Sequence, residues 1–171
     1  MSAIATQPRM PGRLVTIAAK ENGVEEVNGT NCGPRVNEFK AATWLPADQA
    51  WPWCAAFICW VVQQSMKALG IPETATFKRP RTAGAWDLRN WALKQDNTIR
   101  TKDRPGDDIE PGDLIGYTFS HCGIAATKPD KNGYFWAWEG NTDGEGSREG
   151  GAVLKKQRHN SKVKFRLRFT V

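Results

Sequence analysis

The sequence is poor in the residues that most often hold a metal ion or cross-link a fold. Its 171 residues include two histidines and four cysteines, with no Cys-x-x-Cys or His-x-x-x-His spacing. A zinc site needs about four ligands with closer local pairing, so we expect neither a metal nor another cofactor. A chain of this length buries a sizeable core without disulfides, so we expect free thiols.

Long apolar runs are also missing. No stretch approaches the roughly 18 residues that cross a membrane. The opening residues MSAIATQPRMPGR lack the apolar segment of a secretory signal peptide. A content of 40% hydrophobic and 25% charged residues is typical of a globular protein. These features predict a single monomeric domain, residues 1–171, that is made in the cytoplasm without a signal peptide.

Positive charge is concentrated near the C-terminus. The formal net charge is +6, and seven of the 24 Lys and Arg residues fall in the last 17 positions, which contain no acid. Residues 163–171 alternate between apolar and polar with the period of a strand, so Lys164, Arg166 and Arg168 should share one face. That face is either simply solvated or binds a polyanion. Nucleic acid is a rival partner, but no recognised nucleic-acid-binding motif accompanies the charge, and we expect none to bind.

Helical patterns come first along the chain and strand patterns follow. This order is typical of an α+β fold in which N-terminal helices pack on a C-terminal antiparallel sheet. Segments 44–53 and 101–110 show no period and are expected to be irregular. Helices are predicted at 11–23, 34–43, 54–69 and 82–94, and strands at 114–119, 122–127, 134–139, 152–157 and 163–171.

Cys54 differs from the other cysteines in its position. It follows the irregular segment 44–53 and opens the most apolar predicted helix. The positive end of a helix dipole lowers the pKa of a thiol and favours the nucleophilic thiolate. Cys59, deeper in the same helix, should belong to the core, and Cys32 lies in a Gly- and Asn-rich loop. Cys54 is therefore the candidate nucleophile.

A thiolate nucleophile needs a base and a polar group that orients it. His121 opens a short apolar strand, which would place it at a sheet edge, whereas His159 lies in a basic turn. Glu139 and Asn141 are two residues apart in the next strand, so they point to one face and can supply the acceptor. We expect Cys122, the neighbour of His121, to point to the opposite face.

Four short motifs occur in order along the chain, and the resemblance that they carry spans nearly all of it. They are Trp53-Cys54-Ala55-Ala56-Phe57, Pro111-Gly112-Asp113, Ser120-His121-Cys122-Gly123-Ile124 and Glu139-Gly140-Asn141-Thr142. Together they resemble the CHAP domain, the cysteine- and histidine-dependent amidohydrolase/peptidase group of the NlpC/P60-like papain superfamily.

The resemblance implies a papain-like α+β fold and hydrolysis of an amide bond in bacterial peptidoglycan. It implies that Cys54 is the nucleophile and His121 the base. Glu139 and Asn141 form the supporting polar pair, and the resemblance leaves open which of them contacts the imidazole. It also leaves open whether the enzyme is an endopeptidase or an N-acetylmuramoyl-L-alanine amidase.

Further expectations follow from the resemblance. Trp51 and Trp138 are candidates to line an open substrate groove. Some members carry an aspartate-rich calcium loop before the cysteine, but segment 44–53 has only Asp48, so no calcium site is expected. The basic strand would attract anionic wall or outer-membrane polymer.

The absence of a signal peptide favours a bacteriophage endolysin that reaches the cell wall or periplasm through a membrane pore. Four alternatives stay open: an injected wall-degrading amidase toxin, a non-catalytic wall-binding domain, a nucleic-acid-binding domain and a cytosolic amidase of small molecules.

Overall fold

The computed structural model describes residues 7–143 and 150–171. Within these ranges the chain forms four α-helices, one short 3₁₀-helix and six strands. The helices are α1 (Met10–Lys20), α2 (Pro34–Lys40), α3 (Cys54–Leu69) and α4 (Asp87–Ala92), and the 3₁₀-helix is Asn160–Lys162. The strands are β1 (Ile99–Asp103), β2 (Leu114–Tyr117), β3 (Cys122–Ala125), β4 (Tyr134–Thr142), β5 (Ala152–His159) and β6 (Val163–Phe169).

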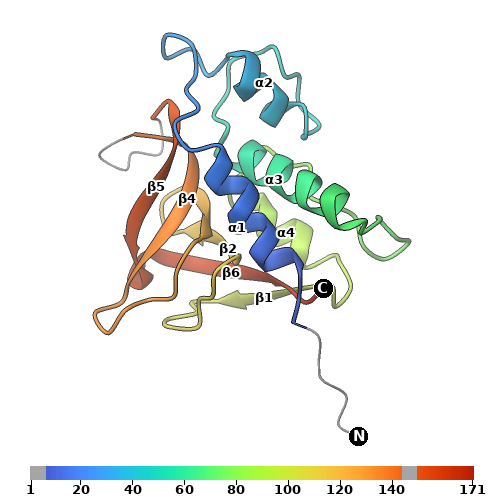
Figure 1. The fold of residues 1–171 in the computed structure, drawn as a ribbon, viewed down its shortest axis with the longest axis vertical. Coiled ribbons are helices and arrows are strands. Elements are labelled where there is room, and N and C mark those ends of the chain that lie inside the picture. Colours follow the sequence, from blue (N-terminus) through green and yellow to red (C-terminus); the bar gives the residue numbers. More distant parts are fainter. Residues whose placement is uncertain (1–6, 144–149) are drawn as a thin grey trace, which may run out of the picture.

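The six strands form one antiparallel sheet in the order β1-β6-β2-β3-β4-β5. The helices gather on one side of it, with α1 and α3 packed together and against β3 and β4 (Figure 1). The predicted fold class, helices packed on a C-terminal antiparallel sheet, is confirmed. In the described part of the chain, each helix falls short of the length and hydropathy that a membrane crossing needs.

Helix α3 is the centre of the main core. Its apolar residues recur on all sides, and Phe57, Ile58, Val61 and Val62 are fully buried. The helix ends at Gly70, which adopts the left-handed conformation that glycine favours at a helix C-terminus. Burial on all sides fixes the helix against the sheet, so its first residue is held in one place.

Two predictions of secondary structure were wrong. The segment 101–110 was expected to be a loop, but its start belongs to the edge strand β1, which pairs with β6 alone. The helix expected over 82–94 is only the six-residue α4. Upstream of it, the Thr82 hydroxyl accepts a hydrogen bond from the Gly84 amide, a local turn contact that competes with helix formation.

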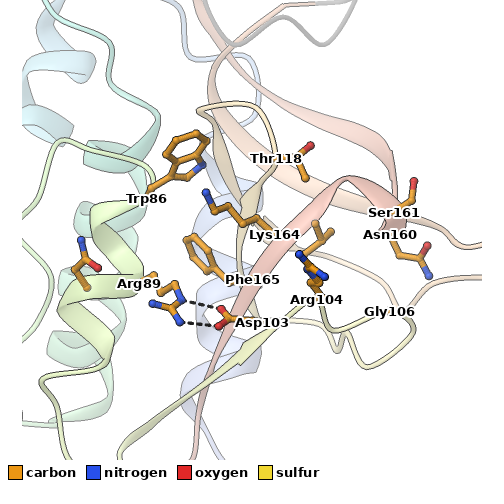
Figure 2. Close-up of a pocket in the computed structure, with 12 residues that line it drawn as sticks. Trp86, Arg89, Asp103, Arg104, Gly106, Thr118, Asn160, Ser161, Lys164 and Phe165 are labelled. Atoms are coloured by element: carbon orange, nitrogen blue, oxygen red, sulfur yellow. Dashed lines mark hydrogen bonds and ion pairs between the residues drawn. The ribbon is translucent and has the colours of Figure 1, made fainter.

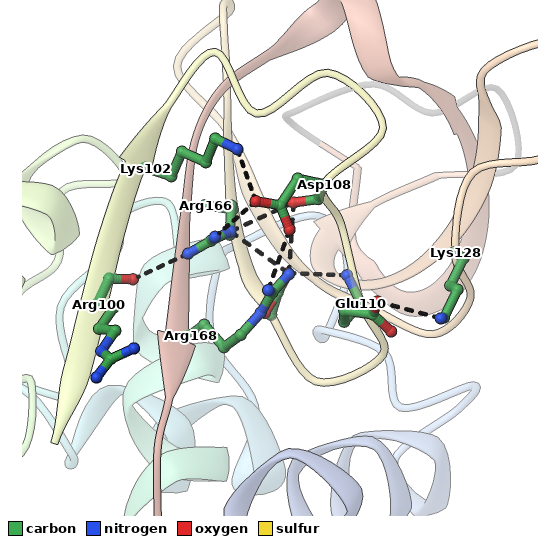
Figure 3. A network of polar contacts seen from close by, with 8 residues as sticks. Arg100, Lys102, Asp108, Glu110, Lys128, Arg166 and Arg168 are labelled. Carbon is green, nitrogen blue, oxygen red and sulfur yellow. Dashed lines mark hydrogen bonds and ion pairs between the residues drawn. The ribbon is translucent and has the colours of Figure 1, made fainter.

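The basic face expected on the last strand is also not what forms. Arg166 is buried and Arg168 half-buried, because β6 lies inside the sheet rather than at its edge. Arg168 forms a bidentate pair with the buried Asp113, and Arg166 lies 3.0 Å from an oxygen of Asp108 (Figure 3). Lys164 lies elsewhere, over an aromatic ring. The three cations therefore do not form one solvated face.

Candidate active site

Cys54 is the first residue of α3, where the sequence pattern predicted it. Trp53 precedes the helix, and its indole N–H donates to a Glu26 carboxylate oxygen at 3.0 Å, which fixes the entry of the chain. The N–H groups of a first helical turn have no acceptor within the helix. Cys54 is 5% exposed, so its thiol is shielded but reachable from one side.

His121 lies just before β3 in a tight turn. Its amide donates to the Phe119 carbonyl and its own carbonyl accepts from the Tyr117 amide. The ring is fully buried, and its Nε2 donates to a Glu139 oxygen at 2.9 Å. This bond leaves Nδ1 buried without a hydrogen-bond partner in the described part of the chain, while the Cys54 thiol interacts with the His121 ring and raises its pKa. The structure thus brings Cys54, His121 and Glu139 together.

Glu139 is the centre of a buried polar network. Its carboxylate accepts from the Tyr117 hydroxyl at 2.7 Å and from the Arg158 guanidinium, with an Nε distance of 2.8 Å, as well as from His121. Sequence reasoning missed Tyr117 and Arg158. Strand β5, which contains Arg158, pairs with β4 beside Glu139. The alternating pattern of β5 was therefore the sequence signal that could have identified Arg158.

Gly140 lets α3 approach this network closely. A Cβ at Gly140 would come within 2.9 Å of atoms of Phe57 and Trp53. Any larger residue would push the helix start away from β4. The glycine of the Glu-Gly-Asn-Thr motif therefore has a packing role. It allows the helix that carries Cys54 to lie beside the strand that carries Glu139.

The electrostatics favour an ionised pair. The hydrogen bond from the Cys122 thiol lowers the pKa of Cys54, burial opposes this, and contact with His121 lowers the pKa further, so the net direction is down. Burial alone would lower the pKa of His121, but contacts with Cys54 and Glu139 outweigh it and raise the pKa to about 9. Burial also raises the pKa of Glu139, yet Arg158 and His121 lower it overall. At neutral pH this arrangement favours thiolate and imidazolium.

Cys122 does not point away from the site as expected. Its thiol hydrogen-bonds with Cys54, and burial together with this contact raises its own pKa. The strand alternation rule failed because His121 lies before β3 and is not part of the strand. Burial raises the pKa of Cys59 to about 12, which agrees with the core role predicted for that residue.

Asn141 is buried in β4 with a φ of 55°. Asparagine tolerates this left-handed conformation better than most residues. This left-handed residue lies where the register between β4 and β5 is irregular. Glu139 rather than Asn141 is the residue whose oxygen hydrogen-bonds with the His121 ring. His159 bonds with the Ser161 hydroxyl and the Asn132 carbonyl, outside this network.

The Cys54 thiol opens into a cavity of about 290 Å³. Trp51, one of the two predicted groove aromatics, lies in its wall, and its indole N–H donates to the Pro46 carbonyl at 2.9 Å. The second, Trp138, is 9% exposed and packs in the main core instead. That expectation was wrong because Trp138 faces the helices. The cavity is lined by Leu45, Trp51, Pro52, Cys54, Ala83, Gly84, Ala85 and Ser120.

The loop before Cys54 is joined to a neighbouring loop by a buried cation. The Lys40 ammonium, fully buried, donates to the carbonyls of Asn31 at 2.8 Å and Gln49 at 2.7 Å. It also lies 3.3 Å from the Cys32 sulfur and 5.4 Å from the centre of the Trp51 ring. An internal cation thus already joins the two loops and would repel a metal ion there. Among the described residues, no group of three or more His, Cys, Asp or Glu side chains is arranged to hold a metal ion.

Comparison with known proteins gives a structural match. The fold is similar to the crystal structure of a wild-type endolysin, LysIME-EF1, with a TM-score of 0.57 and 14% sequence identity. The match covers 95% of this chain and 65% of that one, so this chain spans just under two thirds of that endolysin. At this identity the likeness establishes the shared fold. No family model and no curated protein matches the sequence.

Proposed function

We propose that this protein is a cysteine-dependent peptidoglycan hydrolase of the CHAP type that acts in a bacteriophage endolysin. The observation that carries the proposal is the buried cluster of Cys54, His121 and Glu139, with Cys54 at the wall of a cavity. Likeness to a solved endolysin supports the choice of the bacterial wall as substrate.

The mechanism is acyl transfer. The Cys54 thiolate attacks the carbonyl carbon of an amide bond, and the oxyanion is stabilised by backbone N–H groups at the start of α3. His121 donates its proton to the leaving amine as the carbon–nitrogen bond breaks, which leaves a thioester on Cys54. His121 then takes a proton from water, whose oxygen displaces the thiolate and releases the acid.

Glu139 acts through His121 and does not touch the substrate. Its hydrogen bond to Nε2 holds the ring with Nδ1 toward the sulfur and stabilises the imidazolium. The bidentate contact from Arg158 keeps Glu139 ionised despite its burial. A nucleic-acid-binding role loses support, since Arg166 and Arg168 are occupied by internal carboxylates.

The decisive experiment tests whether the Cys54→Ser variant still hydrolyses the cell wall. Purified sacculi are incubated with the wild type and the variant, and released fragments are identified by mass spectrometry. We expect the wild type to release new amino termini or free stem peptides and the variant to release essentially none. The fragment masses will also tell an amidase from an endopeptidase.

Cys59→Ser is the matched control. It makes the same atomic change five residues along the same helix, in a thiol whose pKa burial raises to about 12. We expect this variant to keep wild-type specific activity as long as circular dichroism shows it folded. Full lysis by Cys54→Ser, or equal loss in both variants with folding intact, contradicts the proposal.

A further inference from the structure

A cavity larger than the one at Cys54 lies elsewhere in the fold. It has a volume of about 810 Å³ and lies where α4, the end of β1 and the start of β6 meet (Figure 2). Trp86 forms one wall and is 41% exposed. Asn160, Ser161 and Thr118 supply hydrogen-bonding side chains on the other side. The cavity is open to solvent and wide enough for a segment of polymer.

The walls of this cavity carry excess positive charge. Arg89 forms a bidentate pair with Asp103, with distances of 2.7 Å and 2.6 Å. Arg104 and Lys164 also act on Asp103, since their charges contribute, after Arg89, to lowering its pKa. Neither of these two cations forms an ion pair within residues 7–143 and 150–171. Three cations therefore surround one carboxylate, and two positive charges are left uncompensated.

The Lys164 side chain and the Arg104 backbone are held in place. The Lys164 ammonium lies 3.7 Å from the centre of the Trp86 ring, a cation–π contact that limits its motion. The Trp86 indole N–H donates to the Tyr117 carbonyl at 2.9 Å. Arg104 has a φ of 46°, and its amide donates to the Lys164 carbonyl at 3.0 Å. A cation restrained in this way, as Lys164 is, loses less entropy when it binds an anion.

This cavity borders the one at Cys54. Residues 83–85 line the Cys54 cavity, and the next residue, Trp86, lines the large one. In the same way, Ser120 lines the Cys54 cavity and Thr118 the large one. Two chain segments thus connect the walls of the two cavities.

We propose that the cavity at Lys164 and Arg104 is an anion-binding subsite that holds a negatively charged group of the same wall polymer whose amide bond lies at Cys54. The inference rests on the proposed function. The ligand chemistry is an anionic oxygen group, which the wall offers as peptide carboxylates or as the phosphodiesters of attached polymers.

The test measures binding to purified sacculi by co-sedimentation in the inactive Cys54→Ser form. A Lys164→Gln/Arg104→Gln variant is compared with a Lys20→Gln/Lys67→Gln control, which removes the same charge from exposed helix ends. We expect the cavity variant to bind about threefold to tenfold more weakly than the control. The difference should shrink at high salt, because exposed charges are screened.

Chemically treated sacculi identify the anion. Hydrofluoric acid removes phosphodiester polymers, and carbodiimide with ammonium converts carboxylates to amides. The difference between the two variants should disappear after one of these treatments, which names the source. A difference that survives both treatments, or equal binding by the two variants on untreated sacculi, overturns the inference.

The proposed function has its own readout in this design. Fragment release by the active wild type is measured on the same sacculi. If the wild type releases fragments while the two variants bind equally, only the subsite is refuted. If the wild type releases none, the hydrolase proposal fails, and the subsite fails with it.

Discussion

Replacing Glu139 with glutamine tests the buried network at its centre. The carboxylate is fully buried and accepts from Tyr117, His121 and Arg158. Glutamine keeps the shape but loses the charge, so the Arg158 guanidinium and the imidazolium lose their counterion. Removing one partner of a buried ion pair costs about 3–5 kcal/mol. Because the glutamine oxygen still accepts one hydrogen bond, we expect the lower end, about 3 kcal/mol.

For a protein of this size, 1 kcal/mol shifts the melting temperature by about 2–4 °C, so Glu139→Gln should melt about 6–12 °C lower. The hydrolysis rate should fall by more than the loss of folded protein explains. An amide can no longer hold the histidine tautomer, and the corresponding change in a Ser-His-Asp hydrolase lowers turnover about 10⁴-fold. Calorimetry and initial rates of sacculus hydrolysis below the melting temperature separate the two effects.

The stability loss should depend on pH. The folded pKa of Glu139 is depressed, so its contribution is present above the unfolded pKa and lost as pH falls through the folded one. The gap in unfolding free energy between wild type and variant should therefore narrow below about pH 4. Glu110→Gln, which breaks a partly exposed pair with Lys128, is the control. Equal melting temperatures for the wild type and Glu139→Gln would refute the reasoning.

Three further outcomes are expected. The hydrolysis rate should fall above about pH 9, where His121 loses the proton it gives to the leaving amine; a rate still rising at pH 10 contradicts the thiolate–imidazolium pair. Arg168→Gln should lower the free energy of unfolding by about 3 kcal/mol in urea denaturation, because the buried Asp113 loses its bidentate partner. Activity on sacculi should survive EDTA, whereas Lys40→Met should impair it and calcium should not restore it.

The sequence was most informative where one local rule acts alone. The apolar spacing from Cys54 to Leu69 and the glycine that follows predicted α3 to its last residue. The alternation over 163–171 predicted β6. Cys54, His121 and Glu139 could be named as candidates because each occupies a recognisable position, at a helix start, a strand start and a strand of alternating side chains. The structure then brings the three together, although their catalytic roles stay a proposal.

The sequence failed where tertiary contacts decide. After the buried Ile99, strand β1 is polar, and its pairing with β6 makes it a strand. Alternation predicted that the basic residues of β6 share one face of the strand. It does not predict which other residues cover that face. Asp108 and Asp113, more than 50 positions away, neutralise Arg166 and Arg168. Cys122 was misplaced because the alternation rule was applied to the pair His121 and Cys122, although His121 lies before β3.

The buried groups of the site alternate in charge. Thiolate, imidazolium, carboxylate and guanidinium follow one another from Cys54 through His121 and Glu139 to Arg158. Each ion has an opposite charge beside it and the four sum to zero, so the desolvation cost of each is offset by its neighbours. Loss of any one leaves an adjacent charge buried without compensation. The resting thiolate of Cys54 thus depends on Arg158, a residue from a different strand that takes no part in the chemistry.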